Sequence, residues 1–259
     1  MSTNEIELKK LKDGIKRCVR LVENLLEDSE ILLKRKRYSS SIALSIIAWE
    51  EISKAHIMRL QMKKGKGLPM NVWRELTTGR KAHAKKLSSI MFERKKRLEQ
   101  KMSSKADAYL NEIAQRLGLP GLADGKTAHV EAIFLEKLFP KLNAVKQDCL
   151  YLNLDKNTNN WINFENRFSN KIKEAVAKFL IATIRRTTAY QKFIFEISMK
   201  PFQKYTKEDW VIALKSKHLK EIQNVYRKTN TKEMGHISDL AMIAIDSYRD
   251  EKKSFEKSD

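Results

Sequence analysis

The chain has 259 residues and a formal net charge of +20, with 42% hydrophobic and 32% charged residues. This mixture excludes an intrinsically disordered chain, which would have too few apolar residues to form a core. Because there are only 8 glycines and 4 prolines, the sequence predicts long helices joined by few turns.

The N-terminus, the apolar runs and the cysteines together indicate a cytoplasmic protein. The segment that begins at Met1 is polar and lacks the apolar core of a signal peptide. The longest apolar run, around Ile42 to Trp49, is too short to cross a bilayer. Cys18 and Cys149 have no metal-binding spacing, and their apolar surroundings favour buried free thiols in a reducing compartment.

Apolar residues recur at helical spacing through most of the chain, and no stretch alternates with the period of two that strands show. The first two predicted helices are joined by a short link, so we expect an antiparallel hairpin, with a serine as the N-cap of the second helix. The predicted helices are Asn4–Lys36, Ser40–Lys64, Asn71–Leu98, a segment to Leu117, His129–Tyr151, Glu165–Met199 and Ile237–Tyr248, with a further helix start at Thr206–Trp210. Gly118–Gly125 and Asp155–Asn160 are predicted loops. The predicted fold class is all-α.

The second predicted helix contains charged residues within an almost wholly apolar sequence. Glu50 and Glu51 are adjacent, and Lys54 follows at helical spacing from both, so the charges can meet along one face. Isolated charges in a protein core are expensive to desolvate. We therefore expect partners for this cluster elsewhere in the chain.

Two further segments place polar groups among apolar ones. Arg80, His83 and Lys86 follow one another at intervals of three residues, which puts them on one face of a predicted helix. Lys146 and Tyr151 lie on a later helix. A histidine can act as a base near neutral pH, an arginine can bind phosphate, and a tyrosine can donate a hydrogen bond. These are the groups that metal-free RNA cleavage requires.

In this order, the three segments resemble the AbiV-type abortive infection proteins, a branch of the HEPN superfamily. The resemblance covers about Ile15 to Phe164, and the helix Glu165–Met199 would complete the bundle. The positions that carry it are Tyr38, Ala43, Glu50-Glu-Ile-Ser-Lys54, Arg80-Lys-Ala-His83-Ala-Lys-Lys86, Lys146-Gln-Asp-Cys-Leu-Tyr151 and Trp161.

The resemblance implies an up-and-down HEPN-like helical bundle over residues 1–200, followed by a helical extension over 201–259. It also implies a homodimer and a role in bacterial defence against phage. Many HEPN proteins are metal-independent ribonucleases whose signature is an arginine, four to six intervening residues and a histidine. Arg80 and His83 have two residues between them. The expected catalytic residues are Arg80, His83, Glu50 and Glu51.

Two classes of function remain open at this point. In the first, the chain is a phage-defence effector that acts on RNA or on a ribosome-associated target after triggering by a phage protein. In the second, it is a non-catalytic RNA- or protein-binding module, in which Lys54, Lys86, Lys146 and Tyr151 belong to a polar network. The net charge of +20 fits a polyanionic partner in either case. A basic helix lying on anionic lipid, around Phe92 to Met102, is a weaker third interpretation. We expect no cofactor, no metal and no membrane partner.

Overall fold

The computed structural model describes residues 5–78, 82, 86, 141–155, 160–197, 221, 224–225 and 232–247. Their helices are α1 (Leu8–Lys34), α2 (Tyr38–Lys63), α3 (Met70–Thr77), α8 (Phe164–Arg167), α9 (Asn170–Ile197) and α12 (Lys232–Asp246), together with helical residues 141–150. The described strands are β1 (Glu5–Ile6), β2 (Leu68–Pro69), β3 (Asn153–Asp155) and β4 (Asn160–Ile162). This architecture confirms the all-α prediction.

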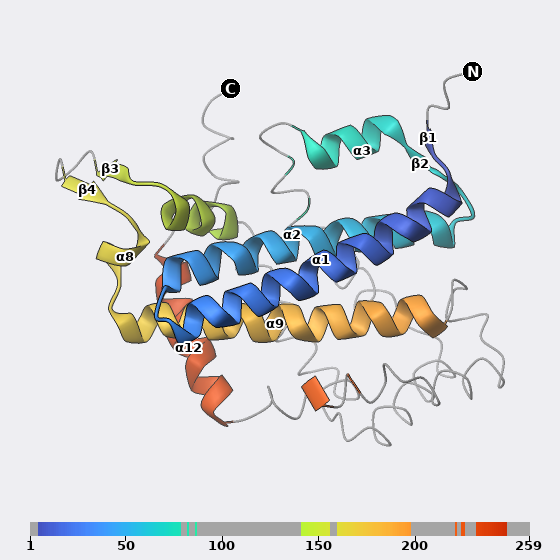
Figure 1. Ribbon diagram of the computed structural model, residues 1–259. Helices are drawn as coiled ribbons and strands as arrows, with labels where there is room; N and C mark the ends of the chain where they lie inside the picture. Colours follow the sequence, from blue (N-terminus) through green and yellow to red (C-terminus); the bar gives the residue numbers. More distant parts are fainter. Residues whose placement is uncertain are drawn as a thin grey trace.

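The three long helices α1, α2 and α9 lie side by side and form the body of the bundle, as Figure 1 shows. Helix α12 crosses the N-terminal end of α9 and packs against it. Residues from all four helices share one hydrophobic core, so α12 contributes to the same core as the N-terminal helices. The division of the chain at residue 200 remains a prediction.

Helix α2 lies at the centre of this arrangement. Ile42, Ile46, Trp49 and Ile52 are almost fully buried. A helix that is covered on most sides needs apolar residues all round, which explains the continuous apolar sequence of this segment. Among the described helices, none is both long and apolar enough to cross a membrane.

The link between α1 and α2 is a tight turn that depends on one left-handed residue. Lys36 has φ 60°, and its N–H donates to the Leu33 carbonyl oxygen at 2.9 Å. The N–H of Arg37 donates to the Leu32 carbonyl oxygen at 2.9 Å. This pair of bonds is a Schellman motif, which satisfies the last carbonyls of α1. The turn is so short that α2 must return antiparallel to α1, as predicted.

The predicted serine cap of α2 is wrong. The N-cap residue is Arg37, and its side chain makes no capping bond. Ser39 and Ser41 lie inside the first turn and are buried. A carboxylate distant in the sequence caps the helix instead, because Glu165 Oε1 accepts the Ser39 N–H at 3.0 Å. Sequence spacing cannot reveal a cap that comes from another element.

The predicted third helix, Asn71–Leu98, ends early. Helix α3 stops at Thr77, and Thr78 is extended, with φ −127° and ψ 152°. The hydroxyl groups of both threonines bond back to carbonyl oxygens of the same helix, that of Thr78 at 2.7 Å from Arg74 O. Such side-chain bonds compete with the helical backbone pattern. The remaining predicted helical residues between 79 and 140, apart from 82 and 86, lie outside the described residues, as does the helix start at Thr206.

The predicted helix Glu165–Met199 is divided in two. Phe168 is extended, with φ −126° and ψ 150°, and separates α8 from α9. The Ser169 hydroxyl oxygen accepts the Ile172 N–H at 3.5 Å, the geometry of a weak N-cap at the start of α9. Phe168 also packs against the core and contacts Phe164, with ring centroids 5.0 Å apart. Burial of this aromatic side chain accompanies a break that helical periodicity alone did not reveal.

The two antiparallel strand pairs are short additions that the prediction did not include. β1 pairs with β2, with Ile6 opposite Leu68, and β3 pairs with β4, with Leu154 opposite Trp161. Gly67 permits the first pairing, because a Cβ there would lie 2.7 Å from the Ile6 carbonyl oxygen. Strands of two or three residues are too short to show an alternating pattern. Of the predicted loop Asp155–Asn160, the two end residues belong to β3 and β4, and residues 156–159 lie outside the described residues.

Candidate functional site, a buried network of one carboxylate and two lysines

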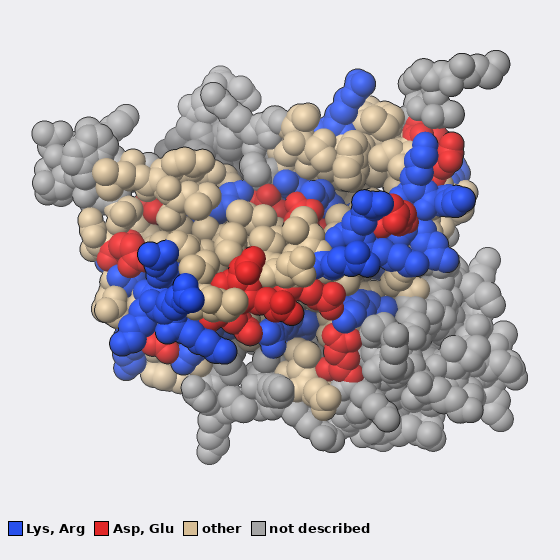
Figure 2. Space-filling view, in the orientation of Figure 1, with Lys and Arg blue, Asp and Glu red and all other residues tan. Residues whose placement is uncertain are grey.

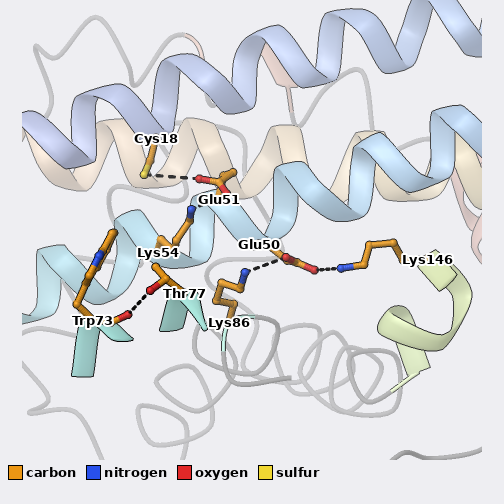
Figure 3. Close-up of polar contacts among 8 residues, drawn as sticks. All are labelled: Cys18, Glu50, Glu51, Lys54, Trp73, Thr77, Lys86 and Lys146. Atoms are coloured by element: carbon orange, nitrogen blue, oxygen red, sulfur yellow. Dashed lines mark hydrogen bonds and ion pairs between the residues drawn. The ribbon is translucent and has the colours of Figure 1, made fainter. Parts of the chain in front are cut away.

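Glu50 forms the centre of the candidate site on the core helix α2. Its Oε2 accepts a hydrogen bond from Lys86 Nζ at 3.0 Å, and its Oε1 accepts one from Lys146 Nζ. Figure 3 shows the two lysines approaching the carboxylate from separate segments of the chain. The exposed fractions are 4% for Glu50, 7% for Lys86 and 4% for Lys146. Residues separated by 36 and 96 positions are thus brought together away from solvent.

The two ion pairs are charge-assisted hydrogen bonds in a desolvated environment. Such bonds are stronger than neutral ones, and each charge needs its partner because a buried unpaired charge is costly. Each carboxylate oxygen of Glu50 receives one ammonium group. The arrangement therefore fixes the segment that contains Lys86 and the helical residues 141–150 against α2.

A third ion pair lies one residue further along α2. Lys54 Nζ is 2.6 Å from Glu51 Oε1, and their side chains are 17% and 15% exposed. The thiol of Cys18, on α1, lies 4.0 Å from Glu51 Oε2. Burial, assisted by the Glu51 charge and opposed by Lys54, raises the pKa of Cys18 to about 11. This thiol is therefore protonated and a poor nucleophile at neutral pH.

The remaining predicted site residues are placed differently. Arg80 and His83 lie outside the described residues. Tyr151 follows the helical residues 141–150 and is 59% exposed, whereas Lys146 on the same helix is buried. The structure thus brings Glu50, Lys86 and Lys146 together, and the catalytic roles of Arg80, His83, Glu50 and Glu51 stay predictions.

The sequence prediction missed a second buried polar network between α2 and α9. His56 Nδ1 lies 3.2 Å from an Arg59 guanidinium nitrogen and 3.1 Å from Gln191 Nε2. Arg59 Nε donates to Gln191 Oε1 at 3.2 Å. All three side chains are at most 5% exposed. The sequence did contain a signal for this network. Arg59 lies three residues after His56 on a core helix, and an arginine in a core requires buried partners.

The prediction also missed the cluster at the N-terminal end of α2. Lys173 Nζ donates to Glu165 Oε2 at 2.7 Å and to the Glu165 carbonyl oxygen at 3.0 Å, and it lies 6.0 Å from the centre of the Tyr38 ring. Burial alone would raise the pKa of Glu165. The hydrogen bonds from Lys173 and Ser39 outweigh that effect and lower the pKa. Glu165 is therefore ionised at neutral pH, as a cap at a helix N-terminus should be.

The described part of the chain contains no group of three or more histidine, cysteine, aspartate or glutamate side chains that could hold a metal ion. The chemistry that the described network can perform is electrostatic positioning. Its charged groups pair with one another and hold neighbouring helices at fixed distances. A reacting group would have to come from residues adjacent to the network.

Comparison with known families shows a match to the HEPN domain model described as AbiV. The match spans residues 10–185, which is more than half of the chain and covers α1 from its third residue, all of α2 and the first part of α9. Searches of curated proteins and of solved structures returned no match. The residues of the Glu50 network all lie within the matched range. The chain belongs to the AbiV family of HEPN-domain proteins, and this membership implies a role in abortive infection, the defence of bacteria against phage.

Proposed function

We propose that this protein is an abortive-infection effector that acts on RNA, with Arg80 and His83 as the reacting pair and the Glu50 network as the structure that positions them. The observation that supports the proposal most directly is the ion pair between Glu50 and Lys86. Lys86 ends the segment Arg80-Lys-Ala-His83-Ala-Lys-Lys86, which contains His83, the predicted general base.

Anchoring Lys86 restricts where His83 can lie. Three residues span at most about 11 Å even when the chain is fully extended, so covalent connectivity alone limits how far the His83 Cα can be from the Lys86 Cα. A reacting histidine needs such a fixed position, because small displacements of a catalytic group reduce the rate strongly. The Glu50–Lys86 pair supplies a rigid attachment of this kind to the core helix.

Roles can then be divided by burial. Glu50, Lys86 and Lys146 are buried and already paired, which suits positioning residues rather than groups that touch RNA. His83 would remove the proton of the 2′-hydroxyl group as its oxygen attacks the adjacent phosphorus. A 2′,3′-cyclic phosphate would form, the P–O5′ bond would break, and the leaving 5′-oxygen would take a proton from water. Arg80 would stabilise the charge that develops on that phosphate. The spacing of Arg80 and His83 is shorter than the HEPN ribonuclease signature, so their contribution requires direct measurement.

The partners in this proposal are an RNA or ribosome-associated target, a phage protein that triggers the activity, and a second copy of the chain, all in the cytoplasm. The net charge of +20 supports an anionic target. A homodimer and a toxic activity are part of the proposal because HEPN proteins often act as paired domains.

The decisive experiment sequences the ends of total RNA from phage-infected cells. The cells express the wild type, Arg80→Ala, His83→Ala or a control variant, His236→Ala. His236 is exposed on α12 and therefore tests the loss of a histidine far from α2 in sequence. We expect discrete new RNA ends with the wild type and with His236→Ala, and neither new ends nor phage resistance with His83→Ala. The assignment would be refuted if a folded His83→Ala protein gave full phage resistance and the same new RNA ends as the wild type.

A second candidate function is non-catalytic binding, and the burial of the whole Glu50 network favours it. A network without solvent access serves the architecture of a binding module equally well. In that case RNA binding would weaken steeply with added salt, and RNA ends would not change under any trigger. The same sequencing experiment separates the two functions.

A further inference from the structure

The basic and the acidic residues of α1 are concentrated in different halves of the helix. Between Lys9 and Arg20 there are six basic residues and one acidic residue, and between Leu21 and Leu33 there are four acidic residues and no basic one. All six basic side chains, Lys9, Lys10, Lys12, Lys16, Arg17 and Arg20, are exposed. Figure 2 shows the result on the surface, where basic residues gather over the N-terminal half of α1 and acidic residues over its later part.

The basic half of α1 borders a hollow of about 300 Å³ between α1 and α9. Ile15, Val19 and Phe195 provide its apolar lining, and Lys16, Arg20, Glu23 and Lys192 provide its polar lining. A volume of this size is at the lower limit of ligand sites, and suits one flat ring rather than a large ligand.

The four charged lining residues differ in how they are engaged. Lys192 Nζ lies 2.7 Å from Glu23 Oε1 and 2.8 Å from Glu221 Oε1, so both Lys192 and Glu23 are committed to each other. Within the described part of the chain, neither Lys16 nor Arg20 forms an ion pair. Among these described residues, nothing competes with an anion from solution for the two cations.

We infer that this hollow and the basic half of α1 bind single-stranded RNA, with backbone phosphates on Lys16 and Arg20 and one base stacked on Phe195. The inference rests on the proposed function, because it names the surface by which the protein grips its RNA. Proteins that bind single strands without sequence preference combine a basic track for the backbone with an aromatic side chain on which a base stacks. Both parts are present here.

The acidic part of α1 gives this surface an end. Glu27 and Asp28 are exposed about two helical turns beyond Arg20. They repel phosphates, so a bound strand would follow the helix from Lys9 to Arg20 and leave it there. The site is separate from the Glu50 network, which involves α2, Lys86 and Lys146.

The first test measures binding of a short fluorescein-labelled 2′-O-methyl oligouridylate by fluorescence anisotropy over a range of salt concentrations. The methylated probe cannot be cleaved by attack of its 2′-oxygen, so binding is measured apart from chemistry. The variant is Lys16→Gln/Arg20→Gln, and the matched control is Lys34→Gln/Arg35→Gln, which removes the same charge from exposed positions at the other end of α1.

We expect the slope of log K against log salt to become shallower by about 1.4 in the first variant, since each phosphate contact on a single strand contributes about 0.7. The control should keep the wild-type slope. Equal slopes for the variant and the control would overturn the inference, because the salt dependence would then follow the net charge of the protein and not the position of the two cations. A variant that changes the oligomeric state on size exclusion while binding RNA normally would also overturn it, and would assign this face to a protein contact.

The second test addresses the aromatic stack. Phe195 also packs against the core, so the variant is Phe195→Leu, which keeps an apolar side chain, with Phe195→Tyr as the control that keeps the ring. We expect Phe195→Leu to weaken binding by about 10-fold or more, and Phe195→Tyr to bind like the wild type. Equal affinity of the two variants, both with the thermal stability of the wild type, would overturn the stacking contact.

The two failures can be told apart. If the wild type generates His83-dependent RNA ends in cells but Lys16→Gln/Arg20→Gln binds the probe normally, the α1 surface is wrong and the proposed function survives. If the wild type neither binds the probe nor changes RNA in cells, the action on RNA itself is wrong.

Discussion

Replacement of Glu50 by glutamine tests whether the buried network stabilises the fold. The change removes one charge and preserves the shape of the side chain, so the two ammonium groups of Lys86 and Lys146 lose a shared anion. The glutamine oxygen can still accept from one lysine, but its NH₂ group would face the other. All three positions are at most 7% exposed, so solvent cannot replace the lost charge.

The expected loss is about 3–5 kcal/mol in the free energy of unfolding, which is typical when one partner of a buried ion pair is removed. Glu51→Gln is the matched control on the adjacent residue. Its pair with Lys54 spans three residues of one helix and is partly exposed, with side chains 15% and 17% accessible. For such a pair we expect a loss of at most about 1 kcal/mol.

Urea unfolding followed by far-UV circular dichroism measures both losses, and equal m-values would show that the two variants unfold to comparable states. The triple variant Glu50→Leu/Lys86→Met/Lys146→Met should recover most of the stability, since apolar groups of similar volume often replace buried ion pairs without loss. If Glu50→Gln costs no more than Glu51→Gln, the Glu50 carboxylate is not held in a desolvated network and the reasoning fails.

Three further predictions follow from other parts of the molecule. Lys36→Gly should raise the free energy of unfolding by about 0.5–1 kcal/mol in urea titrations. Glycine relieves the left-handed strain at φ 60°, and this gain exceeds the cost of a more flexible unfolded chain. A loss of stability in Lys36→Gly, with Lys36→Ala as stable as the wild type, would contradict this. Glu165→Gln should lower stability at neutral pH by less than about 1 kcal/mol, since the carboxylate is 40% exposed. The folded pKa of Glu165 is lowered, so its contribution is present above the unfolded pKa and is lost as the pH falls through the folded pKa; urea titrations at neutral and acidic pH should show the difference between wild type and variant vanish in acid, and a constant difference would contradict the assignment. Native Cys18, with a pKa of about 11, should react slowly with iodoacetamide at neutral pH and quickly in denaturant, as mass spectrometry can follow; rapid labelling of the folded protein would show that the thiol is not buried as described.

The candidate site shows where reasoning from spacing succeeds. Glu50 and Lys146 were predicted site residues because they are charges within apolar helices, and such charges need buried partners. The pairing of Glu51 with Lys54 followed from their separation of three residues on one helix. The partners of His56 and Ser39, by contrast, lie 135 and 126 residues away, on α9 and α8. No local pattern contains that information, because these contacts depend on how the helices pack.

The amino-acid sequence by itself determined the helical class, the antiparallel hairpin of α1 and α2, and the presence of charges that the core would have to accommodate. It did so because helical periodicity and turn chemistry act over a few neighbouring residues. Tertiary structure alone decided that Lys86 and Lys146 meet at Glu50, that Glu165 caps α2, and where α8 ends. These outcomes depend on desolvation, and the packing of distant segments determines which groups lose their water.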